Sequence, residues 1–225
     1  MNTLPQRVLY EYWSSSASCR VRIALNLKGL TYESRAVNLL SHEHQQSYYT
    51  EINRQQLVPT LCENNHCIGQ SLAIIEYLEE MYPHPSIMPE KAVDRSRART
   101  LACVIACEVH PLQGLGVRNY IARHLRSTER HDRSHTINSW CQHCINSGLS
   151  AYEQLLVHHS DTYTFSCADF PTIADCFLIP QVYAASRYGC SLENYPEIQR
   201  IYNNCMGLPA IRRALPDAQP DAKKQ

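Results

Sequence analysis

The sequence has no excess of either charge and no long apolar run. Its 225 residues include 21 Lys and Arg against 21 Asp and Glu, so the formal net charge at pH 7 is zero. A balanced charge without a basic stripe argues against a nucleic-acid-binding protein. No apolar stretch approaches the roughly 18 residues of a membrane-spanning helix, and residues 1–7 contain no apolar signal core. We therefore expect a cytoplasmic protein with neither nucleic acid nor membrane as a partner.

A metal cluster and a disulfide framework are also not indicated, although cysteine is abundant. The chain has eleven cysteines, an odd number, and lacks a secretion signal, which favours reduced thiols. Cys141 and Cys144 have a C-x-x-C spacing, but their flanks are helical in character and no second pair stands at a matching distance. We expect them to be packed thiols on one helix face, like Cys103 and Cys107, and expect no metal site.

What the sequence does have is a serine-rich turn between a strand and a helix. Residues 8–13 are apolar and aromatic, which predicts a strand, and four serines within residues 14–18 interrupt it. An apolar helical pattern follows, so the serines are N-cap candidates. The start of a helix offers unpaired N–H groups and a partial positive charge. The turn is therefore suited to hold an anion, such as a thiolate.

Residues 1–85 alternate strand-like and helix-like stretches in the order β-α-β-α-β-β-α, which predicts a small sheet with helices packed on it. The pair Asn64-Asn65 between two short β-like runs predicts a hairpin. Gln70-Ser71 opens a helix with an apolar stripe.

The remainder is helical in character. Three prolines in residues 82–92 cannot continue the preceding helix, and we take residues 86–92 as a linker. Residues 93–215 are expected to form an all-helical domain, and the polar residues 216–225 a disordered tail.

One helix start in this part has a clear local signal. Thr172 and Asp175 have the spacing of a capping box just before an apolar run. The pattern predicts a helix from that point, as a simple surface cap or as the start of a buried helix.

Five stretches spread along the chain form one further pattern. They are Ser-Ser-Ala-Ser-Cys-Arg-Val-Arg-Ile-Ala-Leu at 15–25, Leu-Val-Pro-Thr at 57–60, Gln-Ser and the helix after it at 70–78, His-Pro-Leu-Gln at 110–113, and Ala174-Asp175 with Pro-Gln-Val at 180–182. Over about residues 7–215 the chain resembles the zeta class of cytosolic glutathione transferases, whose members include maleylacetoacetate isomerase. The resemblance implies an α/β plus all-α architecture, with a thioredoxin-like N-terminal domain, an all-helical C-terminal domain and a homodimer.

The resemblance also implies that glutathione is a cofactor, with its sulfur at the serine turn. Ser15 would donate its hydroxyl to the thiolate, with Ser16 beside it and Arg20 adding positive charge. Lowering a thiol pKa of about 8.5 by two units takes about 2.7 kcal/mol of preferential stabilisation. A hydroxyl donor and a helix N-terminus can supply this. From the residues alone, a polar turn and a structural salt bridge of Arg20 remain alternatives.

The remaining parts of glutathione are assigned in the same way. Val58 would pair its backbone with the cysteinyl backbone of glutathione, before a cis Pro59. Gln70 and Ser71 would hold the γ-glutamyl carboxylate at a helix start. A trans proline and ordinary N-capping are the alternatives.

Four further residues match family positions with less specific signals. Gln46, His110 and Gln113 match positions that contact glutathione, and Arg187 matches a position facing the site, where it would bind a substrate carboxylate. A polar residue on a helix surface explains each of them as well.

The sequence also departs from the family pattern. Ala17 stands where relatives have Cys, Ser14 where many have Arg, and Gln113-Gly114 where they have Asn-Asn or Gln-Asn. Activation of the thiolate by Ser15 survives these changes, whereas tight recognition of a dicarboxylate is put in doubt.

The implied reaction is glutathione-dependent cis–trans isomerisation of maleylacetoacetate to fumarylacetoacetate, in tyrosine and phenylalanine catabolism. The alternatives are a maleylpyruvate isomerase, a general glutathione transferase or dehalogenase, and a non-catalytic interaction module. The retained Ser15, Val58-Pro59 and Gln70-Ser71 disfavour the last of these.

Overall fold

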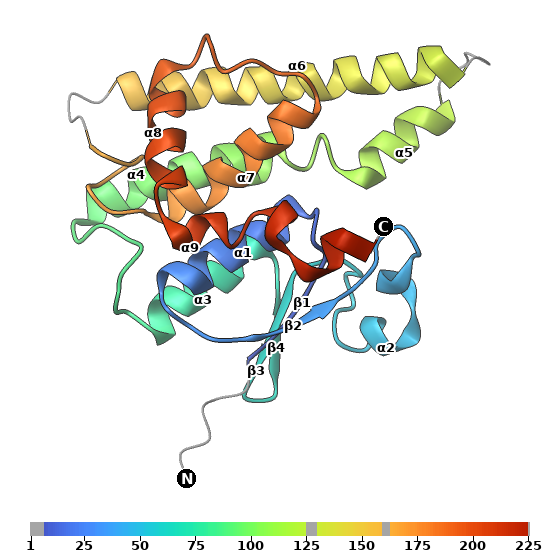
Figure 1. Ribbon diagram of the computed structural model, residues 1–225, viewed down its shortest axis with the longest axis horizontal. Helices are drawn as coiled ribbons and strands as arrows, with labels where there is room; N and C mark the ends of the chain where they lie inside the picture. The colour runs from blue at the N-terminus through green and yellow to red at the C-terminus, as the bar shows by residue number, and fades with distance from the viewer. Residues whose placement is uncertain (1–6, 125–129, 159–162, 225) are drawn as a thin grey trace. The chain divides into compact units, whose positions relative to one another are not determined.

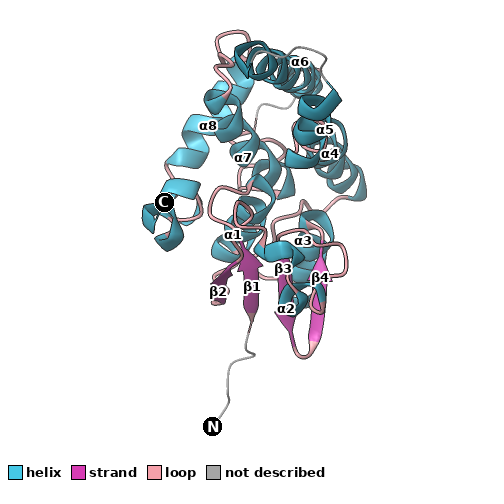
Figure 2. Cartoon of the chain, turned by 90° about the vertical axis from the view of Figure 1, so that its right-hand side faces the viewer, coloured by secondary structure: helices cyan, strands magenta, loops and turns pink. Residues whose placement is uncertain are grey.

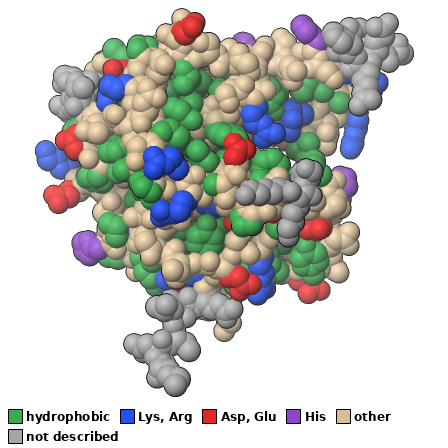
Figure 3. All heavy atoms as spheres, in the orientation of Figure 1, with side chains coloured by type: hydrophobic (Ala, Val, Ile, Leu, Met, Phe, Trp, Pro, Cys, Tyr) green, Lys and Arg blue, Asp and Glu red, His purple; other side chains and the backbone are tan. Residues whose placement is uncertain are grey.

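The computed structural model describes residues 7–124, 130–158 and 163–224, which belong to two compact units (Figure 1). The first unit comprises Met1–Met88 and Met206–Gln225, and the second comprises Pro89–Cys205. Within the described ranges, no helix is both long and apolar enough to cross a membrane. Acidic and basic side chains are interspersed on the face drawn in Figure 3, in line with the balanced composition.

The first unit is built on a mixed four-stranded sheet in the order β2-β1-β3-β4 (Figure 2). Its strands are β1 (Val8–Glu11), β2 (Glu33–Ala36), β3 (Thr60–Glu63) and β4 (His66–Gly69). β2 runs parallel to β1, whereas β3 is antiparallel to both β1 and β4. Asn64 and Asn65 form the predicted hairpin turn with φ of 51° and 65°, the left-handed geometry that two-residue hairpins favour.

The helices of this unit lie on both faces of the sheet. They are α1 (Ser16–Leu27), the short η1 (Glu43–Gln45), α2 (Ser47–Thr50) and α3 (Ser71–Met81). α1 packs on α3, which also contacts β3 and β4. Because side chains alternate across a strand, the opposed and fully buried Leu9 and Leu61 point to one face. Tyr10 and Thr60 point to the other, where Tyr49 of α2 packs. The predicted thioredoxin-like half is confirmed.

The C-terminal segment differs from the prediction, because it belongs to the first unit. It contains α9 (Pro209–Arg212) and the 3-10 turns η3 (Pro216–Ala218) and η4 (Pro220–Lys224), where the sequence predicts an extension of the helical domain and a disordered tail over 216–225. α9 packs on α1 (Figure 1). Asn26 Nδ2 donates to Ala210 O at 2.9 Å, and Arg22 Nε donates to Ala214 O at 2.8 Å. These bonds hold the C-terminal segment against α1, and its local sequence does not predict them.

The second unit is helical, as the sequence predicts. Its helices are α4 (Ala92–Cys103), the π-helical turn η2 (Val104–Val109), α5 (Leu115–His124), α6 (Arg130–Val157), α7 (Ile173–Arg187) and α8 (Pro196–Met206). α4 packs on α7, and η2 packs on α6. Gly148 of α6 permits this approach, since a Cβ built there would lie 1.9 Å from Val109 Cγ2.

The predicted capping box starts a buried helix. Thr172 N donates to Asp175 Oδ2 at 2.7 Å, and Ser166 N donates to Asp175 Oδ1 at 3.0 Å. Asp175 is fully buried, and the loss of solvation raises the pKa of its carboxyl above 3.8. The box therefore fixes both the start of α7 and the preceding turn.

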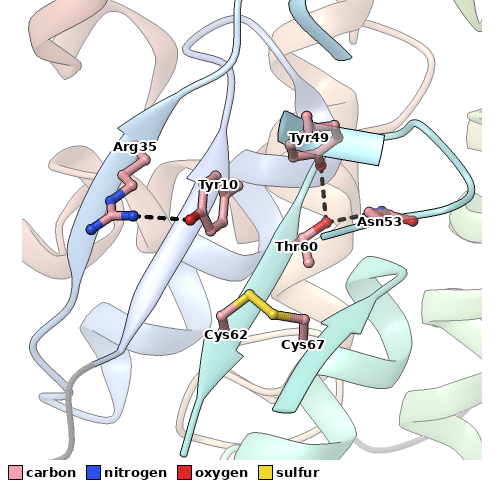
Figure 4. Close-up of a disulfide and its surroundings, with 7 residues drawn as sticks. All are labelled: Tyr10, Arg35, Tyr49, Asn53, Thr60, Cys62 and Cys67. Atoms are coloured by element: carbon pink, nitrogen blue, oxygen red, sulfur yellow. Dashed lines mark hydrogen bonds between the residues drawn. A yellow bond between two sulfur atoms is a disulfide. The ribbon is translucent and has the colours of Figure 1, made fainter. Parts of the chain in front are cut away.

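The expectation of reduced thiols throughout is wrong at one pair. Cys62 and Cys67 lie opposite one another in the β3–β4 register and form a disulfide (Figure 4). Their pairing follows from the strand register, which the positions of the cysteines along the chain do not reveal. Cys141 and Cys144 are buried free thiols on α6, as predicted.

Candidate functional site

The serine turn lies between β1 and α1, and Ser15 is the N-cap of α1. Its Oγ accepts a hydrogen bond from the backbone N–H of Ser18 at 3.2 Å. Ser15 and Ser16 are half-buried, and Ser16 is the first residue of the helix. A serine hydroxyl carries one proton and two lone pairs, so capping leaves the Ser15 proton available for an acceptor. The capping and anion-binding interpretations are therefore compatible.

The side chain of Arg22 holds the serine turn in place, a role that the sequence did not indicate. Its side chain is fully buried, with Nη1 2.5 Å from Glu11 Oε2 and Nη2 3.1 Å from Trp13 O. Its Nε reaches Ala214 O. A single guanidinium thus joins the end of β1, the start of the turn and the C-terminal segment. The planar guanidinium carries several donors in fixed directions, which suits it to bonding three separate segments.

Cys19 does not replace the family's missing cysteine. Its side chain is fully buried, and its Sγ donates to Ala214 O at 3.2 Å. Burial raises the pKa of this thiol to about 11, despite the nearby Arg22. Cys19 is therefore a protonated packing residue.

The peptide bond between Val58 and Pro59 is cis, as the family resemblance implies. Val58 is half-buried immediately before β3. The preceding carbonyl, Leu57 O, accepts from Tyr49 Oη at 2.5 Å and from Asn53 Nδ2 at 2.9 Å. Two side chains of the α2 region therefore hold the backbone that leads into Val58.

Ser71 begins α3, and the structure brings Arg20 to it. Arg20 Nη1 donates to Ser71 Oγ at 3.3 Å, and both side chains are buried. Gln70 has a left-handed φ of 65°, and its Nε2 donates to Gln55 Oε1 at 2.7 Å. Non-glycine residues with such a φ are uncommon and concentrate at functional sites. Arg20 thus supports the start of α3, a neighbour that the sequence did not predict.

Gln46 precedes α2 at its N-cap position, where its side chain is exposed and makes no capping bond. The described part of the first unit therefore offers the Ser15 hydroxyl proton, the backbone of Val58 before a cis proline and the Ser71 hydroxyl backed by a cation. These are the donors that a peptide thiol with a free carboxylate requires, so the residues fit glutathione.

The other candidates belong to the second unit. His110 follows the π-helical turn η2 and is half-buried. Gln113 is buried, and its Nε2 donates to Oε1 of the fully buried Gln181 at 2.7 Å. Arg187 is an exposed residue in the last turn of α7. Gln181 lies in the Pro-Gln-Val motif at 180–182, and this motif was the sequence signal that could have identified the partner of Gln113.

Comparison with known proteins agrees with this arrangement. Residues 9–86 match the family model of the glutathione S-transferase N-terminal domain. A maleylpyruvate isomerase of Ralstonia sp. is 44% identical over 214 residues, which are 95% of this chain and 99% of that protein.

Solved structures give the same family over the whole length. A holo structure of maleylpyruvate isomerase, a bacterial zeta-class glutathione S-transferase, has a TM-score of 0.90 and 42% identity, covering 95% of this chain and 99% of its own. A maleylacetoacetate isomerase from Anaeromyxobacter dehalogenans 2CP-1, with glutathione bound in its active site, has a TM-score of 0.85 and 37% identity, covering 97% and 98%. The chain belongs to the zeta class of the glutathione S-transferase family.

Proposed function

We propose that this protein is a glutathione-dependent cis–trans isomerase that converts maleylacetoacetate to fumarylacetoacetate. The observation that carries the proposal is the Ser15 hydroxyl, which caps α1 through its oxygen and keeps its proton for a thiolate. The identity to zeta-class isomerases over nearly the full chain supports the reaction type.

Bound glutathione would supply a thiolate that adds reversibly to a conjugated double bond; the resulting single bond can rotate, and the double bond forms again when the thiolate leaves. Ser15 donates to the sulfur, and the N–H groups at Ser16 and the following residues add the field of the helix start. A water-poor pocket makes such donors more effective than they are in water. Together these donors lower the pKa of the bound thiol, so that the sulfur is deprotonated at neutral pH.

The other residues position the tripeptide. The Val58 backbone pairs with the cysteinyl backbone, and cis Pro59 presents it. Ser71 and the Gln70–Ser71 helix start hold the γ-glutamyl carboxylate, with Arg20 stabilising the charge behind Ser71. From the family resemblance, Gln46 is assigned a further glutathione contact.

From the family resemblance we also assign His110 and Gln113 to glutathione and Arg187 to a substrate carboxylate. The substrate is a diacid, and negative charge develops on it during addition, so a guanidinium is a suitable partner. Arg187 is exposed and sits at the end of α7, where its charge is accessible.

The proposed reaction implies a metabolic pathway and a cellular location. Maleylacetoacetate belongs to tyrosine and phenylalanine catabolism, and reduced glutathione is a cytoplasmic thiol, so we place the protein there. We also propose that it forms a homodimer, as the family resemblance implies. Light scattering coupled to size exclusion tests the dimer directly.

Isomerisation of maleylpyruvate is the second candidate, because the Ralstonia protein with that activity in its name is 44% identical to this chain. The decisive experiment measures kcat/KM for maleylacetoacetate and maleylpyruvate side by side, with and without glutathione. We expect glutathione-dependent turnover with a preference for maleylacetoacetate. A preference for maleylpyruvate selects the second candidate. Glutathione conjugation or dehalogenation without isomerase activity indicates a general transferase, and the absence of saturable glutathione binding indicates an interaction module.

A further inference from the structure

The Cys62–Cys67 disulfide lies outside the proposed glutathione site and has no role in the isomerisation. It joins β3 to β4 across the Asn64-Asn65 turn, with a Cα–Cα distance of 4.1 Å and a sequence separation of five. Cys67 is exposed on the edge strand β4, and Cys62 is half-buried. A cross-link that closes so short a loop restricts the unfolded chain little, and exposed disulfides are the ones open to thiol attack.

A groove of about 480 Å³ runs along this disulfide and has the size of a small-molecule site. Both cysteines line it together with polar groups that include Tyr10, Arg35, Glu63 and Asn65. Arg35 is about half exposed, pairs its Nε with Glu33 Oε1 at 2.7 Å, donates its Nη1 to Tyr10 Oη at 3.0 Å and points along the same face of the sheet (Figure 4). A guanidinium beside an accessible disulfide suits a thiol that carries carboxylates.

We propose that Cys62 and Cys67 form a reversible redox pair that exchanges with free glutathione. The glutathione thiolate attacks Cys67 Sγ, because Cys67 is the more exposed residue of the pair. The disulfide breaks as a glutathione–Cys67 bond forms, and Cys62 leaves as a thiolate that takes a proton from solvent. A second glutathione thiolate attacks the glutathione sulfur of this mixed disulfide and releases oxidised glutathione and the Cys67 thiolate. Two electrons pass from two glutathiones to the protein disulfide.

The state of this pair is connected to the proposed cofactor site through β3. Thr60 lies two residues from Cys62 on the same face, and its Oγ1 is 2.9 Å from both Tyr49 Oη and Asn53 Nδ2 (Figure 4). The same two side chains bond Leu57 O, next to Val58. Opening the disulfide frees β3 from its covalent tie to β4 and weakens the restraint on this network. This second step rests on the proposed function, whereas the exchange itself does not.

The exchange is tested on the full chain purified without reductant. Accessible thiols are blocked with a maleimide, and the protein is then incubated with millimolar reduced glutathione, alkylated with a second reagent and mapped by mass spectrometry. We expect the second label on Cys62 and Cys67, and glutathione bound to Cys67 at early times. Cys107, an exposed free cysteine, is the internal control and should take the first label.

Two variants make the result decisive. Cys62→Ser should accumulate a stable mixed disulfide on Cys67 when treated with oxidised glutathione, whereas Cys107→Ser should exchange like the wild type. First-reagent labelling of both Cys62 and Cys67, even after treatment with oxidised glutathione, would overturn the pair. A disulfide that persists in millimolar glutathione would overturn the exchange.

The connection to the cofactor site is measured with S-methylglutathione, which has no thiol and cannot exchange. We expect the reduced protein and the Cys62→Ser/Cys67→Ser variant to bind it about threefold more weakly than the oxidised protein, a size typical of coupling through a packed network. Equal affinities would overturn the coupling. No binding by any form would contradict the proposed function and leave the exchange result standing.

Discussion

Ser15 Oγ accepts a hydrogen bond from the backbone N–H of Ser18 at 3.2 Å, and this bond does not use the hydroxyl proton of Ser15. One side chain therefore ends the strand–turn–helix transition and offers a donor at the same point. Stability and thiolate activation can be separated by substitutions that keep one of these functions.

Ser15→Ala removes both functions and Ser15→Asp keeps the cap but carries no proton. We expect Ser15→Ala to lower stability by about 1 kcal/mol, and both variants to lower kcat by about a hundredfold, the typical cost of one lost donor to a developing anion. Thermal unfolding and the ultraviolet absorbance of the bound thiolate against pH provide the measurements. A normal thiolate pKa shift in Ser15→Asp would show that Ser15 is only a cap.

Arg22 is paired with a fully buried partner, Glu11, and its loss should be severe. Arg22→Leu leaves the Glu11 carboxylate without its cation, and breaking a buried pair in this way costs about 3–5 kcal/mol. Arg35→Ala is the matched control, since the Arg35–Glu33 pair is about half exposed and such pairs contribute about 0–1 kcal/mol. Urea unfolding of both variants should separate them clearly, and similar midpoints would contradict the role of Arg22.

The buried thiol of Cys19 predicts a loss of stability at alkaline pH. Its pKa is about 11 in the folded protein against an ordinary value of 9.0. Between these pH values the unfolded chain releases a proton that the folded chain keeps, so stability falls as pH rises from 9 to 11, by up to about 2.7 kcal/mol from this group. Cys19→Ala should show a shallower decline of the free energy of unfolding over this range. Parallel curves for the two proteins would exclude this contribution.

The end of the chain should matter for the serine turn. Asp221 Oδ2 accepts the backbone N–H of Trp13 at 3.2 Å, two residues before Ser15. We expect Asp221→Ala to lower stability by about 1 kcal/mol, the usual net value of such a bond, and to weaken glutathione binding measured by calorimetry. Asp221→Asn retains an acceptor and should resemble the wild type. Equal losses in both variants would assign the effect to charge.

Gly148 is constrained by close packing, and Gly116 in α5 is not. A Cβ at position 148 would meet Val109, whereas nothing lies within 4 Å of one at position 116. Gly148→Ala should cost about 1–3 kcal/mol through overpacking, and Gly116→Ala should stabilise by about 0.5–1 kcal/mol. Adding Val109→Ala to Gly148→Ala should recover part of the loss in chemical denaturation. A loss that is purely additive would mean that the two side chains do not compete for space.

Features defined by neighbouring residues could be predicted from the sequence. The Asn64-Asn65 hairpin, the serine N-cap and the Thr172–Asp175 box each depend on backbone geometry within a few residues, and all three are present. The family motifs extended this to the order of the elements and the cis peptide before Pro59.

Features that depend on distant partners could not be predicted in this way. The Cys62–Cys67 bond requires a strand register, and the return of the C-terminal segment depends on donors of α1 that reach carbonyls almost 200 residues away. The contact of Arg20 with Ser71 also depends on two helix starts that meet only in the fold. The partner of Gln113 likewise came from another helix.

The contribution of residues 206–225 to the first unit has a consequence for biosynthesis. The serine turn and most of its sheet leave the ribosome early, but Ala214, which accepts from Arg22 and Cys19, is made only after the helical unit. Domains generally fold as units once their residues are available. The Arg22 guanidinium therefore lacks one of its acceptors until the helical unit and the segment after it have been made, and only then can the first unit be completed.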